Sequence, residues 1–161
     1  MKAAIIMGSD SDWPILKPAA ELLKSFGVEV EVVVASAHRT PAKVRDFVLS
    51  APEKGIGVFI VAAGAAAHLG GVVASYTTLP VIGVPINATA LNGMDALLST
   101  VQMPTGIPVA TVAVNGGANA ALLAAQILAV EDAALAEKLD AKRKADAAAV
   151  LAKDEGIAER L

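Results

Sequence analysis

The chain has 161 residues, of which 55% are hydrophobic, 3% aromatic and 18% charged, with a formal net charge of −3. This length predicts a single domain, and this composition excludes an intrinsically disordered chain. Cysteine is absent, which excludes disulfides, thiolate catalysis and cysteine metal sites. The sequence has no basic tract, which argues against nucleic-acid binding. With few bulky side chains to fill a core, such an apolar chain is expected to bury surface against copies of itself.

Short apolar runs rich in valine and isoleucine recur along the chain, and most lack strict alternation. This pattern is typical of parallel strands that are buried on both faces. It predicts strands at residues 3–7, 28–34, 57–62, 80–84 and 109–114. The first run is too short for a secretory signal, and no run reaches the roughly 18 apolar residues of a membrane span. We therefore expect a cytoplasmic protein.

Helical patterns lie between the apolar runs. Apolar residues at spacings of three and four predict a first helix over residues 14–26, which Gly27 would end. Thr40 can cap a second helix over residues 41–50, and Pro41 suits its first turn. Further helices are expected near residues 66–75, 93–102 and 119–130. This alternation predicts an α/β fold, a three-layer (αβα) flavodoxin-like sandwich around a central parallel sheet.

The last stretch, residues 131–161, has a different composition. Leucine and valine side chains stand among closely spaced charged ones, which predicts a long amphipathic helix beyond the sheet. Such a helix packs either on its own domain or on a neighbouring subunit, and the sequence leaves both positions open. We expect a single domain over residues 1–161, with residues 131–161 as a C-terminal helical extension that packs on a neighbouring subunit.

Polar side chains gather where the first three predicted strands end. Ligands of open parallel sheets bind beyond the C-terminal ends of the strands, near the switch in strand order. The three segments are GSDSDWP (residues 8–14), ASAHRTP (residues 35–41) and AGAAAHLGG (residues 63–71). Both histidines of the chain lie in these segments. The sequence therefore predicts one ligand site at this edge of the sheet.

The segment after the first strand is suited to an anion. Free N–H groups at the start of a helix, together with the helix dipole, attract phosphate. The hydroxyls of Ser9 and Ser11 add hydrogen-bonding groups, and Asp12 would accept hydrogen bonds from sugar hydroxyls. The alternative is that Ser11 or Asp12 only caps the helix.

The other two segments supply a cation and two imidazoles. Arg39 can hold a phosphate through two parallel hydrogen bonds, unless it is an ordinary solvated arginine. His38 is the candidate proton carrier, because imidazole gains and loses protons near neutrality; the alternative is a histidine that only hydrogen-bonds its loop. For His68, within a run of alanine and glycine, a structural or binding role is favoured.

Several nucleotide-binding patterns are absent from the sequence. No G-x-G-x-x-G follows the first strand, and no G-K-[ST] occurs, so neither a dinucleotide fold nor a P-loop is predicted. Two histidines without nearby paired carboxylates make a poor metal site. We expect a pocket for a small phosphorylated ligand, with an acid/base histidine and with neither a metal nor an organic cofactor.

Four segments resemble the motifs of a known family. GSDSDW (residues 8–13), SAHRTP (36–41), AAHL (66–69) and VQMPTGIPVATVA (101–113) are similar to those of the bacterial class I 5-(carboxyamino)imidazole ribonucleotide mutases. These are the catalytic subunits of phosphoribosylaminoimidazole carboxylase. The resemblance covers residues 3–130. It implies a cofactor-free isomerase of purine (IMP) biosynthesis, which moves a carboxyl group from an exocyclic nitrogen to an imidazole carbon, and a homo-octamer with active sites at subunit contacts.

The resemblance also implies a role for each matched residue. His38 would be the catalytic acid/base, which protonates the nitrogen as carbon dioxide leaves and later removes the ring proton. Arg39 and nearby serines would bind the phosphate, and Asp12 the ribose. The implied substrate-binding positions are Ser9, Asp12, Ser36, Arg39, Gly64 and His68.

The chain departs from the family pattern at two positions. Gly70 stands where the family usually has proline, and Ala65 stands where glycine is common. Gly70 would make the third segment less rigid, and the Ala65 methyl group would reduce the space beside the imidazole ring of the substrate. Two other functions stay open: an aminoimidazole ribonucleotide carboxylase that uses carbon dioxide directly, and a non-catalytic subunit that binds a phosphorylated metabolite.

Overall fold

A parallel sheet lies at the centre of the computed structural model, which describes residues 1–158. It has five strands in the order β2-β1-β3-β4-β5, all parallel to their neighbours. The strands are β1 (Lys2–Met7), β2 (Glu29–Val34), β3 (Ile56–Gly64), β4 (Val81–Ile86) and β5 (Ala110–Thr111). The predicted central parallel sheet is confirmed.

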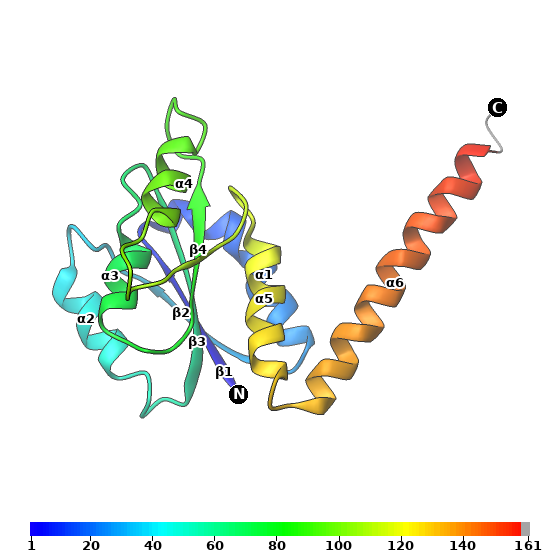
Figure 1. Cartoon of the computed structure of the whole chain (residues 1–161), viewed down its shortest axis with the longest axis horizontal. Helices are drawn as coiled ribbons and strands as arrows, with labels where there is room; N and C mark the ends of the chain where they lie inside the picture. The colour runs from blue at the N-terminus through cyan, green and yellow to red at the C-terminus, as the bar shows by residue number, and fades with distance from the viewer. Residues whose placement is uncertain (159–161) are drawn as a thin grey trace.

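Helices cover both faces of the sheet (Figure 1). On one face α1 (Trp13–Ser25) packs beside α5 (Gly117–Ala129), and both contribute to one buried core cluster. On the other face lie α2 (Pro41–Leu49), α3 (Leu69–Ser75) and α4 (Met94–Val101). The molecule therefore has the three layers that the sequence predicts.

The missing alternation in the strands follows from this burial on two sides. Ala3, Ile5 and Met7 of β1 belong to the core cluster beneath α1 and α5. Ala4 and Ile6 belong to the cluster beneath α2 and α3, and all five side chains are at most 2% exposed. Because each face of the strand is covered, every position after Lys2 is apolar and no polar face remains.

Small residues let α1 and α5 approach closely. Four alanines of α5 are fully buried: Ala120, Ala121, Ala124 and Ala125. At Gly117, the first residue of α5, a Cβ atom would collide with the carbonyl oxygen of Ile15. The scarcity of aromatic residues in this chain is therefore matched by close packing of helices instead of large side chains.

Two elements are shorter than predicted. The fifth apolar run forms only Ala110–Thr111 of β5, because an extra residue interrupts the ladder: Val112 N donates to Gly83 O, whereas Asn115 N donates to Pro85 O. Helix α3 begins at Leu69 instead of about residue 66, because Ala65 has φ +53° and turns the chain before the helix starts.

The C-terminal extension forms one long helix, α6 (Ala133–Ala158), which runs away from the three layers (Figure 1). Its first turns pack on their own domain through Leu135 and Leu139, and Lys138 Nζ donates to Phe26 O at 2.7 Å. Beyond these turns the described side chains are mostly exposed, and charged residues interrupt the apolar face. The predicted helix is confirmed, but an amphipathic stripe is present only at its start. Residues 159–161 lie outside the described part of the chain.

Within residues 1–158, no helix combines the length and the apolar composition that a membrane crossing requires.

Candidate active site

The predicted site residues meet at one edge of the sheet. Strands β2, β1 and β3 are neighbours, so the loops after them lie side by side at the C-terminal ends of the strands. The order reverses between β1 and β3, which is where open parallel sheets bind ligands. A hollow of about 400 Å³ lies there. Its lining includes every predicted site residue: Ser9, Asp12, Ser36, His38, Arg39, Gly64 and His68.

Serine hydroxyls organise the segment after β1. Ser9 Oγ accepts hydrogen bonds from the backbone N–H of Ser11 at 3.3 Å and from the Ser11 hydroxyl at 2.8 Å. Ser9 therefore caps a short 3₁₀ turn, Asp10–Asp12, which leads directly into α1. The alternative that the side chain of Ser11 or Asp12 caps α1 is wrong. Asp12 holds the N-cap position of α1 without a side-chain cap bond, and Ser11 lies in the preceding turn, which Ser9 caps.

Asp12 is a buried acid on the wall of the hollow. Asp12 is among the lining residues, and it is only 5% exposed. Burial raises the pKa of its carboxyl above the ordinary value, although hydrogen bonds from the Ser9 backbone and the Ser11 hydroxyl act in the opposite direction. Since the Asp12 carboxyl forms no ion pair within residues 1–158 and does not cap α1, it is available to accept hydrogen bonds from a ligand.

Arg39 connects two walls of the hollow. Its Nη2 donates to the carbonyl oxygen of Gly8 at the end of β1, at 3.2 Å. Its Nε lies 3.5 Å from Ser36 Oγ, which also accepts the Arg39 backbone N–H at 3.1 Å. The guanidinium is exposed in the single chain, and these contacts hold it against the ends of β1 and β2.

Thr40 does not cap α2 as the sequence predicts. It occupies the N-cap position, but its side chain makes no capping hydrogen bond. The hydroxyl instead accepts the backbone N–H of Ser36 at 2.8 Å and donates to the Ser36 carbonyl oxygen at 3.2 Å. The threonine thus closes the loop between β2 and α2.

The two histidines contact each other directly. His38 Nε2 lies 2.8 Å from His68 Nδ1, and the rings meet edge to face with their centroids 4.9 Å apart. At this distance one ring donates a hydrogen bond to the other, which joins the loops after β2 and β3. His38 therefore does more than hydrogen-bond its own loop.

Sequence reasoning missed part of the lining. Ala88, in the loop after β4, faces Gly64 so closely that a Cβ on Gly64 would lie 2.6 Å from the Ala88 Cβ. Glycine is required at position 64 because the β4–α4 loop passes directly against it. The sequence marks Ala88 only by its position: it follows the fourth strand, as His68 follows the third.

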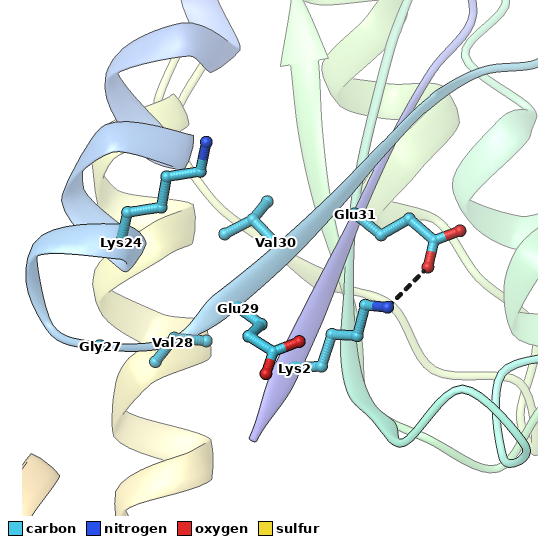
Figure 2. A pocket seen from close by; sticks show the side chains of 7 residues that line it. All are labelled: Lys2, Lys24, Gly27, Val28, Glu29, Val30 and Glu31. Carbon is cyan, nitrogen blue, oxygen red and sulfur yellow. Dashed lines mark ion pairs between the residues drawn. The ribbon is translucent and has the colours of Figure 1, made fainter.

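A second hollow, of about 510 Å³, lies at the opposite ends of β1 and β2 (Figure 2). Lys2 and Lys54 bind the two carboxylate oxygens of Glu31 at 3.0 and 2.7 Å. The hydrogen bond from Lys54, and then that from Lys2, holds the pKa of Glu31 below its ordinary value. The carboxylate of Glu31 is thus already paired, and none of the predicted site residues lines this hollow. The C-terminal edge therefore remains the candidate site.

Comparison with known proteins adds independent information about this arrangement. Residues 2–149, which include all of the strands and the whole candidate site, match the family model described as AIR carboxylase. The chain belongs to the AIR carboxylase family. The family resemblance that the sequence motifs indicate is thereby confirmed.

Relatives within the AIR carboxylase family are similar over most of their length. The N5-carboxyaminoimidazole ribonucleotide mutase of Pyrococcus horikoshii is 56% identical over 147 residues, covering 88% of this chain and 83% of the relative. The protein of the same name from Vibrio parahaemolyticus is 54% identical over 154 residues, covering 94% and 96%. The crystal structure of Treponema denticola PurE has a TM-score of 0.85 at 29% identity and covers 96% of both chains.

Proposed function

We propose that this chain is an N5-carboxyaminoimidazole ribonucleotide mutase, an isomerase of purine (IMP) biosynthesis. The observation that carries the proposal is the imidazole pair of His38 and His68, 2.8 Å apart, in one hollow with Arg39 and Asp12. That hollow combines a proton-transfer group, a phosphate-binding cation and a hydrogen-bond acceptor for sugar hydroxyls. The relatives named as mutases, at 56% and 54% identity, support the same function.

The substrate's phosphate and ribose would lie against the segments after β1 and β2. A guanidinium has five N–H donors, so the contacts of Arg39 with Gly8 and Ser36 leave others for a phosphate. Ser9 and Ser36 line the same hollow, and their hydroxyls would add donors to the same phosphate. Asp12, which lies deeper, would accept hydrogen bonds from the ribose hydroxyls.

The imidazole ring of the substrate would lie between the histidines and the wall formed by Gly64. His38 gives its proton to the exocyclic nitrogen as the bond between nitrogen and the carboxyl carbon breaks and carbon dioxide leaves. The ring carbon then attacks the trapped carbon dioxide, and His38 takes the proton from that carbon. His38 thus loses one proton and regains one, so this single imidazole returns to its starting state after each cycle.

Retaining carbon dioxide requires an enclosed site, whereas His38, Arg39 and His68 are exposed in the single chain. We therefore include in the proposal a homo-oligomer, an octamer, in which neighbouring subunits close the hollow. Exposed apolar side chains on α4 and on the free part of α6 are the candidate contacts, and residues 131–161 would pack on a neighbour. The proposal also includes a cytoplasmic location, because a charged ribonucleotide does not cross membranes unaided.

A substrate comparison tests this function. Purified protein, with a chelator and without ATP, is given either the carboxyamino ribonucleotide or the uncarboxylated ribonucleotide with bicarbonate. Rapid conversion of the first alone is the expected result. Conversion of the second alone would assign the direct carboxylase reaction instead. Conversion of neither, with measurable binding of the product, would favour a non-catalytic binding subunit.

His38→Asn tests the assigned acid/base. Asparagine keeps a polar side chain of similar reach but cannot carry the proton, so kcat should fall by about 10²- to 10⁴-fold. Calorimetric titration with the carboxylated product should give nearly the wild-type affinity, because the phosphate and ribose contacts remain. A variant with near wild-type turnover would remove His38 from the mechanism.

A further inference from the structure

The loop that carries His38 and Arg39 is closed by a single hydroxyl. Thr40 Oγ1 accepts the backbone N–H of Ser36 at 2.8 Å and donates to the backbone carbonyl of Ser36 at 3.2 Å. The backbone N–H of Thr40 donates to the same carbonyl at 2.9 Å. Both backbone polar groups of Ser36 are therefore fixed from the far end of the loop.

The position of Thr40 would ordinarily give its hydroxyl another task. It is the N-cap residue of α2, where threonine commonly accepts an N–H of the first helical turn. Here the side chain makes no such bond, so α2 begins without a side-chain cap. The hydroxyl is committed to the loop at the expense of the helix.

The residues between the two ends of this closure are those that face the ligand. Ser36 Oγ accepts two N–H groups of Arg39, and His38 reaches across to His68. Ser36, His38 and Arg39 all line the hollow, whereas Thr40 does not. The Thr40 hydroxyl thus acts on the site only through the backbone of the loop.

From this geometry we infer that Thr40 is a positioning residue for the acid/base and for the phosphate-binding arm. It sets the separation of His38 and His68, and the direction of the Arg39 guanidinium, by holding Ser36 at a fixed distance from the start of α2. The inference rests on the proposed function for its effect on turnover, but its effect on the histidine pair is independent of any reaction.

Substitutions at Thr40 separate the hydroxyl from the volume of the side chain. Thr40→Val keeps the shape of the side chain but removes both hydrogen bonds of the hydroxyl to Ser36. Thr40→Ser keeps both of these hydrogen bonds. Thr40→Ala removes them and the branched side chain together. Thr77→Val is the matched control: the Thr77 hydroxyl also accepts a loop N–H, that of Leu79, but in the loop between α3 and β4, and Thr77 does not line the hollow. Thermal melts establish that each variant is folded.

The kinetic readout is the split between kcat and KM. Displacement of a catalytic group by about 1 Å can cost on the order of 100-fold. We expect kcat/KM of Thr40→Val and Thr40→Ala to fall by about 10- to 100-fold, with part of this loss in kcat. Thr40→Ser and Thr77→Val should stay within about threefold of the wild type. Equal losses in Thr40→Val and Thr40→Ser would overturn the inference.

The spectroscopic readout needs no substrate. The chain has two histidines, so ¹⁵N-histidine NMR reports both imidazoles without overlap from others. The wild type and Thr40→Ser should show the nitrogen shifts of a hydrogen-bonded pair, and Thr40→Val should show two independent rings. An unchanged pair in both Thr40→Val and Thr40→Ala would overturn the inference. A wild type without mutase activity would refute the proposed function alone, since the histidine spectra still decide the positioning by Thr40.

Discussion

Asp12 is a carboxyl kept almost out of water at the end of β1. It is 5% exposed, and burial raises its pKa more than the hydrogen bonds of Ser9 and Ser11 lower it. A raised pKa means that the folded state binds the proton more tightly than the unfolded state does. Stability therefore falls as the pH rises from the ordinary carboxyl range through the pKa of the folded protein. At neutral pH the buried, ionised carboxyl of Asp12 therefore destabilises the folded chain.

Asp12→Asn should remove that cost. We expect the variant to unfold at a higher temperature than the wild type at pH 7, and to lose ribose affinity. The difference should vanish at acidic pH, where the wild-type carboxyl is protonated in both states. Thermal melts from about pH 3 to about pH 8, together with KM, measure both effects.

Asp140→Asn provides the control for this prediction. Asp140 is an exposed carboxylate on α6, far along the chain from the site, so the same substitution should leave the melting temperature nearly unchanged. Equal melting curves for Asp12→Asn and the wild type at neutral pH would mean that the buried carboxyl does not destabilise the fold.

Single residues of the site were predictable where chemistry and position agree. His38, Arg39 and Ser9 follow strands directly and carry the groups that a phosphorylated ligand needs. The contact between His38 and His68 was not predictable, because it depends on β2 and β3 flanking β1 and on the closure of the loop at Thr40. Strand order and side-chain direction are properties of the folded chain, and the local sequence does not contain them.

Between β3 and α3 the backbone is strained. Ala65 has φ +53°, in the left-handed region where a Cβ is unfavourable, and its residue lines the hollow. The chain needs this turn to bring His68 back toward His38 before α3 begins at Leu69. The methyl group thus narrows the site at a cost in stability.

Ala65→Gly should stabilise the fold. Relief of the left-handed backbone is worth about 1–2 kcal/mol, and the added freedom of glycine in the unfolded chain costs about 0.4–1 kcal/mol, so a net gain of roughly 0.5–1 kcal/mol is expected. Ala66→Gly is the matched control: it is also exposed but has no positive φ, so it should only destabilise. Denaturant unfolding compares them, and equal losses in both would contradict strain at Ala65.

Among the elements, long periodic segments were predictable and short edge elements were not. The pattern of α1 and the apolar run of β3 carry their own signals over nine or more residues. The apolar run over residues 109–114 predicts a longer strand than β5, because the extra residue before Asn115, which ends the ladder, leaves no mark in the pattern. The missing cap at Thr40 has the same origin: the hydroxyl has two possible partners, and only the tertiary structure decides between them.

At the scale of the whole molecule, α4 is packed in an unusual way. It buries its small residues, Ala96 and Thr100, against the sheet. Met94, Leu98 and Val101, with Leu91 just before the helix, are 48–63% exposed and recur at spacings of three and four. A helix of a monomeric protein turns such a stripe toward its own core, so this one is suited to contact another subunit. The loop between β4 and α4 also contributes Ala88 to the lining of the hollow, so the proposed subunit contact through α4 would lie near the site.

Leu98→Glu should break this contact. A carboxylate placed without a partner in an apolar interface costs about 3 kcal/mol or more, repeated at each equivalent contact of a symmetric assembly. Light scattering and sedimentation should therefore show a smaller species, with lower turnover because carbon dioxide escapes from the open site. Leu49→Glu is the control: it places the same charge on α2, at a leucine that is 57% exposed, compared with 50% for Leu98. This variant should leave the assembly intact. If both variants keep the wild-type size, the stripe on α4 is not an interface; if the wild type itself is a monomer with full activity, a single chain encloses carbon dioxide well enough without neighbours.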